Sequence, residues 1–269
     1  MLSARLITSA TSIKFGTLIQ VSKIGILVVA YNAESTIEST LNRIPQEFVS
    51  EIYSILISDD RSKDLTSARA SNFARSSRLP IQVISQPINL GYGGNQKFGY
   101  SWAIKNDWDI VVLLHADGQY APEFIAQIVA PILEDKADAV FGSRMLNKKD
   151  ALKGGMPKYK WIGNQILTFA QNKLTNQNFS EWHSGYRAYR VESLKNLNLG
   201  KLSNGFRFDT QIILELLAKN QRITEIPIPT FYGDEVSHVN GLEYAREIIW
   251  DTFRHRVKHG VSKESSIEK

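Results

Sequence analysis

The strongest constraint on the fold is a repeated unit in which a short apolar run leads through a polar loop into a segment with helical spacing of apolar residues. Four such runs, rich in β-branched residues, cover residues 24–29, 55–57, 81–84 and 110–114. Runs of this kind are typical of strands that are covered on both faces. Strands that alternate with helices predict an α/β fold with a mostly parallel central sheet flanked by helices.

Composition limits the classes of protein that this chain can belong to. Its 269 residues, 43% of them hydrophobic, are enough to bury a full core. There is no cysteine, which excludes disulfides and thiolate zinc sites, so a bound metal needs oxygen or imidazole ligands. The net charge of +5 is too mild to indicate nucleic acid as a partner. No apolar stretch is long enough to span a membrane, and we expect a cytoplasmic protein, either free or peripheral at the cytoplasmic face of the membrane.

The two ends of the chain differ from its middle. Residues 1–22 are rich in serine and threonine and contain no acid, which predicts a flexible leader before a main domain over residues 23–235. Residues 236–269 form the third predicted part, an amphipathic helix with a basic end followed by a tail. Two interpretations of this helix stay open: it lies on an anionic bilayer, or it packs against the core of its own domain. Polar and glycine-rich residues at 147–157 predict a long loop.

Polar side chains gather where the predicted strands end. Asp59 and Asp60 follow the second apolar run, and His115, Asp117 and Gln119 follow the fourth. The carboxyl ends of parallel strands share one edge of a sheet, where open α/β folds bind ligands. Carboxylate and amide oxygens suit Mg²⁺ or Mn²⁺, and a diphosphate completes the shell of such an ion. An aspartate pair in a turn before a helix is also common as ordinary helix capping.

Seven segments, taken in order and spacing, resemble the family 2 glycosyltransferases of the GT-A fold. The resemblance is strongest to the polyprenol-phosphate, dolichol-phosphate mannose synthase-like subgroup, and it covers about residues 23–235. The matching segments are residues 30–34, 59–66, 89–95, 115–119, 142–144, 184–190 and 206–210. The implied fold is the Rossmann-like architecture of nucleotide-diphospho-sugar transferases.

The resemblance implies a metal-dependent transfer of a hexose, with inversion, from a GDP- or UDP-linked sugar to an acceptor. The implied acceptor is polyprenyl phosphate or another lipid or glycan. By position, Asp117 and Gln119 would ligate the metal, and Arg144 would add a cation beside the phosphates. The remaining residues expected to bind the nucleotide sugar are Tyr31, Glu34, Asp60, Gly91, His115, Ala116 and His183.

One position departs from the family pattern. The family's metal motif usually begins with a carboxylate, and His115 stands there instead. Imidazole is a poorer ligand for Mg²⁺, so we expect weaker metal binding or a preference for Mn²⁺. This departure supports one alternative, a catalytically weak protein that only binds nucleotide sugars. A sugar nucleotidyltransferase is disfavoured because residues 30–35 offer no glycine-rich loop bearing Arg or Lys.

Two carboxylates are candidates for the general base that accepts a proton from an attacking hydroxyl. Glu181 comes first, because in the resembling enzymes an acid three positions before the Ser-Gly pair lies near the transferred sugar. Asp209 comes second, and it reads equally well as a structural first-turn acid of a helix. A lipid phosphate acceptor is already anionic and needs no strong base.

Overall fold

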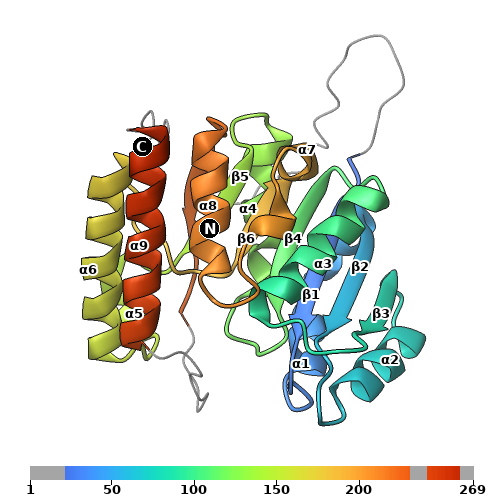
Figure 1. Ribbon diagram of the computed structural model, residues 1–269. Helices are drawn as coiled ribbons and strands as arrows, with labels where there is room; N and C mark the ends of the chain where they lie inside the picture. Colours follow the sequence, from blue (N-terminus) through green and yellow to red (C-terminus); the bar gives the residue numbers. More distant parts are fainter. Residues whose placement is uncertain (1–21, 231–240, 261–269) are drawn as a thin grey trace, which may run out of the picture.

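A seven-stranded sheet organises the part of the chain that the computed structural model describes, residues 22–230 and 241–260 (Figure 1). The strands are β1 (Ile24–Ala30), β2 (Ile52–Asp59), β3 (Ile81–Ser85), β4 (Ile110–His115), β5 (Ala139–Ser143), β6 (Arg187–Arg190) and β7 (Ile223–Pro227). Their order in the sheet is β3-β2-β1-β4-β6-β5-β7. Only β6 runs antiparallel to its neighbours, so the predicted mostly parallel α/β sheet is confirmed.

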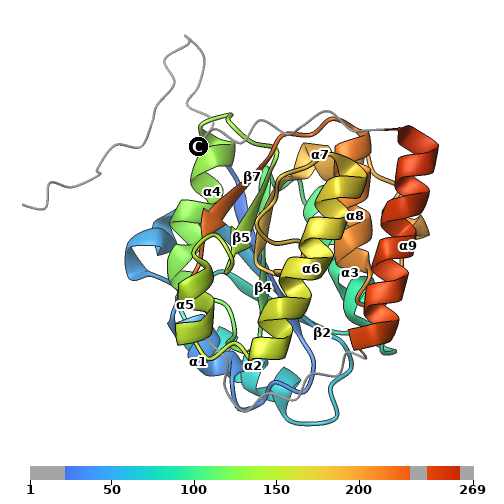
Figure 2. The ribbon, with the colours of Figure 1, turned by 90° about the vertical axis from the view of Figure 1, so that its left-hand side faces the viewer.

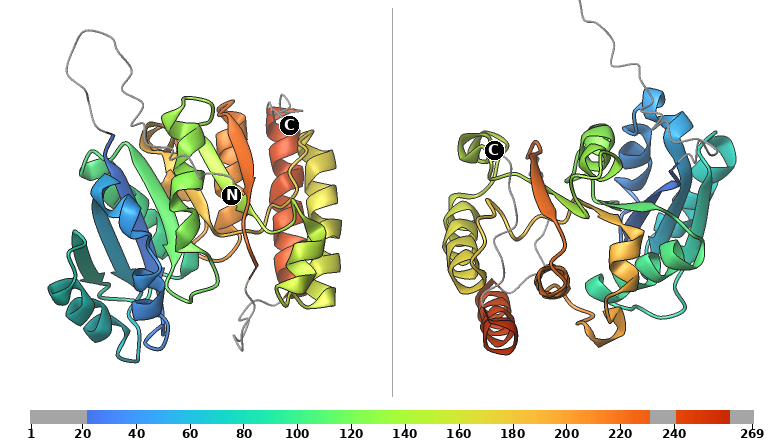
Figure 3. Two further views of the ribbon diagram at one scale, coloured as in Figure 1. Left: turned by 180° about the vertical axis from the view of Figure 1, so that it is seen from behind. Right: turned by 90° about the horizontal axis from the view of Figure 1, so that it is seen from above.

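Helices cover both faces of this sheet. They are α1 (Ile37–Asn42), α2 (Thr66–Ser76), α3 (Tyr92–Lys105), α4 (Ile125–Leu133), α5 (Lys148–Lys153), α6 (Lys158–Thr175), α7 (Val191–Lys195), α8 (Phe208–Ala218) and α9 (Gly241–His259). Short 3-10 helices span Gln46–Glu51, Pro122–Phe124 and Leu199–Lys201. Figure 1 shows α3 and α8 in front of the sheet, and the view from behind in Figure 3 shows α1 and α4 on the other face.

The central strand β1 shows why the fold needs two helical layers. Ile26 and Val28 point to one face and pack in a cluster with α1, α2 and α4. Leu27 and Val29 point to the other face and pack with α3, α7 and α8. Every residue of β1 is buried, as expected of a strand covered on both sides. Gly99 lets α3 lie close to β1, because a Cβ there would come within 2.2 Å of the Leu27 side chain.

Helices α6 and α9 form an outer layer beside this core (Figure 2). Helix α9 packs against both α6 and α8 and buries Ile248, Thr252 and His255. It therefore packs on its own domain through one face, while Leu242, Phe253 and Val257 stay exposed. Among residues 22–230 and 241–260, no helix has the length and apolar character that crossing a membrane requires.

The predicted loop over residues 147–157 was wrong in part, because α5 occupies its first half. Ala151 and Met156 bury their side chains against Met145, and this small apolar cluster fixes the segment. The predicted leader lies outside the described residues except for Ser22, and so do the tail and the boundary after residue 235. The predicted division into domains therefore stays a prediction.

Candidate active site

A cavity of about 1140 Å³ opens where the carboxyl ends of β1, β2 and β4 meet. The structure brings all but two of the expected site residues to its wall. The residues on the wall are Tyr31, Asp60, Gly91, His115, Ala116, Asp117, Gln119, Arg144, His183 and Asp209. The two that do not line it are Glu34 and Glu181. Tyr92, Asn164, Phe206 and Tyr244 line the cavity but were not expected there.

Asp60 is fixed at the cavity wall by the loop that precedes α3. Its carboxylate oxygens accept the backbone N–H groups of Leu90 at 2.6 Å and Gly91 at 3.0 Å. Gly91 has a φ of 79°, a conformation that favours glycine, and this turn directs its N–H at the carboxylate. Burial raises the pKa of Asp60. The loop and the aspartate therefore hold each other in one arrangement beside the cavity.

Asp117 and Gln119 are placed as oxygen ligands for a hard cation. The Asp117 Oδ1 atom accepts the Gln119 backbone N–H at 3.0 Å, and both side chains line the cavity. No group of three or more His, Cys, Asp or Glu residues is gathered as a metal cage within the described ranges. Two protein oxygens in an open cavity suit an ion that takes the rest of its shell from phosphate and water. The residues present therefore fit Mg²⁺ or Mn²⁺ in company with a diphosphate.

His115 lies beside two tyrosine rings on the same wall. Its ring centroid lies 5.6 Å from that of Tyr92 and 5.2 Å from that of Tyr120. Its Nε2 atom is buried and makes no hydrogen bond to the described residues. A Cβ at Gly185 would lie 2.8 Å from this nitrogen. Burial lowers the pKa of His115, so the imidazole stays neutral at physiological pH.

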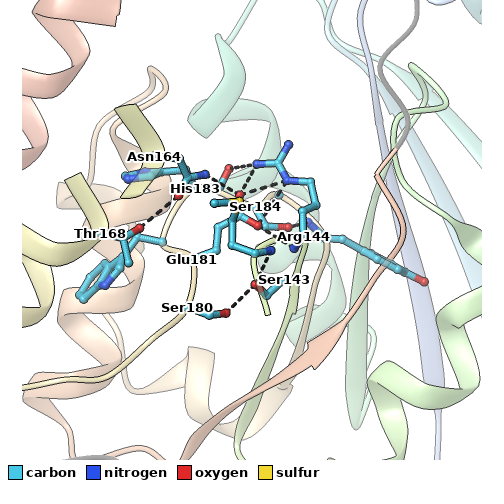
Figure 4. A network of polar contacts seen from close by, with 12 residues as sticks. Ser143, Arg144, Asn164, Thr168, Ser180, Glu181, His183 and Ser184 are labelled. Atoms are coloured by element: carbon cyan, nitrogen blue, oxygen red, sulfur yellow. Dashed lines mark hydrogen bonds and ion pairs between the residues drawn. The ribbon is translucent and has the colours of Figure 1, made fainter. Parts of the chain in front are cut away.

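Arg144 places a guanidinium on the cavity wall, and Glu181 lies behind it (Figure 4). The Arg144 backbone N–H donates to Glu181 Oε2 at 2.8 Å, and its Nε donates to Oε1 at 3.0 Å. Asn164 of α6 donates to Oε1 at 2.8 Å. The Glu181 side chain is 0% exposed. Burial raises the pKa of Glu181, but the charge and hydrogen bonds of Arg144 outweigh this effect and lower it below the ordinary value.

This arrangement does not suit Glu181 as a general base. Its oxygens accept from Arg144 and Asn164, and Glu181 is not among the residues that line the cavity, so in this arrangement its carboxylate faces these partners and not the cavity. Glu181 instead positions Arg144. The resemblance to the family implied that Glu181 lies near the sugar, but it did not reveal that Arg144 holds this carboxylate behind the cavity wall.

A further carboxylate, Glu225 of β7, supports the same turn and was missed in the sequence. It accepts the Ser180 backbone N–H at 2.7 Å, the Ser180 hydroxyl at 2.8 Å and the Glu181 backbone N–H at 3.1 Å. Burial raises the pKa of Glu225 to about 7. The only signal in the sequence was one acid inside the short run 223–227, which looks the same as an exposed residue of an edge strand.

Asp209 lies on the cavity wall, but both of its carboxylate oxygens accept hydrogen bonds from other side chains. It accepts the Tyr92 hydroxyl at 2.7 Å and the Gln96 amide at 3.3 Å. The buried Arg187 guanidinium is 3.5 Å away. Burial opposes the charge of Arg187, yet Asp209 raises the pKa of Arg187, so the guanidinium stays charged. These contacts join α3, β6 and α8, which favours the structural interpretation of Asp209.

Glu34 braces a loop and does not reach the cavity. Its Oε2 atom accepts the Leu65 backbone N–H at 2.9 Å, while its own N–H donates to Asp64 at 3.1 Å. Its side chain is turned toward the start of α2, and the expectation that Glu34 binds the nucleoside stays a prediction.

The far wall of the cavity comes from α6 and α9 and is largely apolar. Tyr159, Ile166 and Leu242 line it, together with His183 and Tyr244. The His183 Nδ1 and the Tyr244 hydroxyl are 3.1 Å apart, which ties the loop after Glu181 to α9. Burial lowers the pKa of His183 to about 4, so this imidazole is neutral. One cavity thus joins a polar end at the strand tips to an apolar end between two helices.

The fold is that of a GT-A glycosyltransferase. Glucosyl-3-phosphoglycerate synthase from Mycobacterium tuberculosis, solved with Mn²⁺ and UDP-glucose, superposes with a TM-score of 0.66 at 18% identity, over 90% of this chain and 80% of that one. A second structure of that enzyme, with Mn²⁺, UDP and glucosyl-3-phosphoglycerate, gives 0.65 at 17% identity over 90% and 81%.

Residues 25–197 match the glycosyl transferase family 2 model, and the chain belongs to this family. It is 30% identical over 222 residues to the UDP-N-acetylglucosamine--dolichyl-phosphate N-acetylglucosaminyltransferase of Methanococcus voltae, covering 78% of this chain and 86% of the relative. It is 28% identical over 218 residues to the undecaprenyl-phosphate mannosyltransferase of Micrococcus luteus, covering 78% and 84%. The resemblance to the polyprenol-phosphate subgroup is confirmed by these relatives, and the chain is a glycosyltransferase.

Proposed function

We propose that this enzyme transfers a hexose from a UDP- or GDP-linked sugar to polyprenyl phosphate, with inversion at the anomeric carbon and with Mg²⁺ or Mn²⁺ as cofactor. Two relatives act, by their names, on dolichyl or undecaprenyl phosphate. The fold neighbour binds Mn²⁺ and UDP-glucose. The nucleotide sugar would occupy the polar end of the cavity and the lipid its apolar end.

The observation that carries this proposal is that the lining of this one cavity is polar at one end and apolar at the other. Asp60 and Asp117 stand at the strand ends, whereas Tyr159, Ile166 and Leu242 stand on the helices. A nucleoside diphosphate needs hydrogen-bond partners and a cation, and a polyprenyl chain needs apolar surface. Both requirements are met within one space, so the two substrates can meet there.

In the proposed reaction, an oxygen of the acceptor phosphate attacks the anomeric carbon from the side opposite the diphosphate. A new C–O bond forms as the bond to the diphosphate breaks, and the electron pair of that bond leaves with the diphosphate. Arg144 presents its guanidinium to the negative charge that develops on this leaving group. Asp117 and Gln119 would hold a divalent cation, which would supply further positive charge beside the diphosphate.

The occupied carboxylates favour a phosphate over a sugar hydroxyl as the acceptor. A hydroxyl must lose its proton during attack, and Glu181 and Asp209 are held by Arg144 and by Tyr92 and Arg187. A phosphate monoester is already ionised at neutral pH and attacks without a base. The structure thus suits an acceptor that makes no demand on either carboxylate.

The test is release of nucleoside diphosphate from UDP- and GDP-sugars with a short polyprenyl phosphate, with and without EDTA. We expect release that requires the lipid phosphate, stops with EDTA and returns with added Mn²⁺. Release of pyrophosphate would indicate a nucleotidyltransferase. Donor binding in a thermal-shift assay without any release would indicate a protein that only binds nucleotide sugars.

A further inference from the structure

Helix α1 ends against the turn that carries Asp117, and side chains at its end hold the backbone of that turn. Arg43 follows α1 directly, and its Nη1 atom donates to the Gly118 carbonyl oxygen at 3.1 Å. The Thr40 hydroxyl, three residues earlier, donates to the Ala116 carbonyl oxygen at 3.4 Å. The carbonyl groups on both sides of Asp117 are therefore bonded to the end of one helix.

A single peptide group connects Arg43 to the Asp117 carboxylate. The peptide between Gly118 and Gln119 accepts from Arg43 through its oxygen, and through its N–H it donates to Asp117 Oδ1 at 3.0 Å. Hydrogen bonds in such a row polarise one another. The orientation of this one peptide therefore decides whether the Asp117 carboxylate keeps its partner and from where the Gln119 side chain starts.

Gly118 does not fix this orientation by itself. Its φ is 78°, and a Cβ added there would meet only the Thr40 hydroxyl within 4 Å among the described residues, at 3.6 Å. Glycine changes its backbone conformation more freely than other residues, so the peptide that follows it can rotate unless an outside group holds it. The Arg43 guanidinium supplies such a hold.

Arg43 is itself held by Glu123, which lies in the 3-10 helix Pro122–Phe124 after the turn. The Nε and Nη2 atoms of Arg43 donate to the two Glu123 carboxylate oxygens at 2.8 and 3.1 Å, and this forked pairing fixes the plane of the guanidinium. Burial raises the pKa of Glu123, but the hydrogen bond from Arg43 outweighs this effect and lowers it, so the carboxylate is charged at neutral pH. The turn is thus gripped between α1 and the 3-10 helix.

This ion pair lies outside the cavity that it supports. The Arg43 and Glu123 side chains are 30% and 47% exposed, and neither lines the cavity, whereas Asp117 and Gln119 both do. An exposed ion pair contributes little to the stability of a fold. Removing the Arg43 guanidinium should therefore act on the turn, with little effect on the rest of the protein.

We propose that Arg43 is a positioning residue of the metal site. It fixes the peptide between Gly118 and Gln119, so that Asp117 and Gln119 present their oxygens to one divalent cation. The inference rests on the proposed function, because it takes these two residues as the metal ligands. Removing a partner that orients a metal ligand typically lowers metal affinity by about 10- to 100-fold.

The experiment is titration of the full-length protein with Mn²⁺ at saturating UDP or GDP, with free Mn²⁺ measured by electron paramagnetic resonance. Arg43→Met keeps the apolar stem but removes every donor, and we expect it to weaken Mn²⁺ binding by about 10- to 100-fold. Its thermal midpoint without metal should fall by less than about 4 °C. Arg43→Lys has one ammonium for either Gly118 or Glu123, and its affinity should lie between those of the wild type and Arg43→Met.

The matched control is Arg69→Met. It removes another exposed ion pair of α1, in which Arg69 lies 3.7 Å from Glu38, and it leaves the Asp117 turn untouched. We expect this variant to bind Mn²⁺ as the wild type does. A loss as large as that of Arg43→Met would overturn the inference, because the effect would then follow from the loss of surface charge.

The same titration separates this inference from the proposed function. Equal Mn²⁺ affinities of the wild type and Arg43→Met would overturn the inference and leave the function standing. Weaker binding by Arg43→Met, together with a wild type that releases no diphosphate, would support the inference and overturn the transfer reaction. If the wild type binds no Mn²⁺ with either nucleotide, the metal of the proposed function and this inference both fail.

Discussion

The Arg144 guanidinium lies on the cavity wall and rests against the Glu181 carboxylate, which is shut off from solvent behind it. Arg144 also donates its backbone N–H to the same carboxylate at 2.8 Å, so both the side chain and the main chain are held. A cation with so few degrees of freedom is ready to meet a diphosphate without reorganising. In the proposed function, Glu181 would contribute to the chemistry by fixing Arg144.

Glu181→Gln should lower the free energy of unfolding by about 3–5 kcal/mol, because it leaves the Arg144 charge partly buried without its partner. Arg144→Met added to Glu181→Gln should recover part of this loss, with a coupling energy of about 1–3 kcal/mol. Urea denaturation of the two single variants and the double variant measures both quantities. The exposed pair of Arg43 and Glu123 is the control, where Glu123→Gln should cost less than about 1 kcal/mol. Strict additivity at Arg144 and Glu181 would contradict the prediction.

Glu225 should make stability fall as the pH rises from about 5 to 8. Its pKa is about 7 in the folded protein against an ordinary value of 4.5, so between these values the folded state holds a proton that the unfolded state releases. The free energy of unfolding then decreases with pH by up to about 3 kcal/mol. Glu225→Gln cannot titrate and should lack this decrease.

The difference in unfolding free energy between the wild type and Glu225→Gln, measured by urea at several pH values, isolates this effect. His183, with its pKa lowered to about 4, acts in the opposite direction below pH 6.5, where the unfolded state binds the extra proton. That contribution is the same in both proteins and cancels. A difference that stays constant from pH 5 to 8 would show that Glu225 is already ionised throughout this range.

The first four strands were predictable because their chemistry is local. Strands β1, β2 and β4 are apolar runs that are largely buried on both faces, which leaves no other use for such segments. Strand β3 lies at the edge of the sheet and is only partly buried, but its apolar run still marked it as a strand. Strand β6 has the sequence Arg-Ala-Tyr-Arg and gives no such signal. Its Arg187 is buried only because Asp209 and the carbonyl oxygens of Trp182 and Ser184 surround it, and these partners come from elsewhere in the fold.

The candidate site divides in the same way. Asp60, His115 and Asp117 follow predictable strands directly, so the topology alone brings them to one cavity. Glu34 and Glu181 were expected on its wall as well, but loop N–H groups and Arg144 turn their carboxylates elsewhere. A loop carboxylate turns toward the hydrogen-bond donor or cation that binds it most strongly. The sequence does not show which donor or cation the fold will bring near it. The apolar wall from α6 and α9 depends wholly on how the helices pack.

Asp117→Asn should remove the metal-dependent part of donor binding and reduce transfer by about 100-fold or more, because a neutral amide is a weaker ligand for a hard cation. The amide oxygen can still accept the Gln119 N–H, so the loop should keep its shape. Thermal-shift titration with UDP- or GDP-sugar and Mn²⁺ measures binding, and release of diphosphate measures transfer. Asp107→Asn is the control, since Asp107 is exposed in a turn with a φ of 51° that asparagine tolerates. Equal stabilisation by Mn²⁺ and donor in both variants would remove Asp117 from the metal site.

Two glycines should respond in opposite directions to replacement by alanine. At Gly93, in the first turn of α3, a Cβ would lie 2.5 Å from the Phe208 Cβ and 2.6 Å from the Ser203 carbonyl oxygen. Gly93→Ala should therefore push α3 away from the loop before α8 and cost about 1–3 kcal/mol of stability. At Gly163, inside α6, a Cβ meets nothing within 4 Å, and Gly163→Ala should add about 0.5–1 kcal/mol through helix propensity. Thermal and urea unfolding of both variants measures these changes. If Gly93→Ala is as stable as the wild type, the backbone at residue 93 must lie further from the Phe208 Cβ and the Ser203 carbonyl oxygen than these distances indicate.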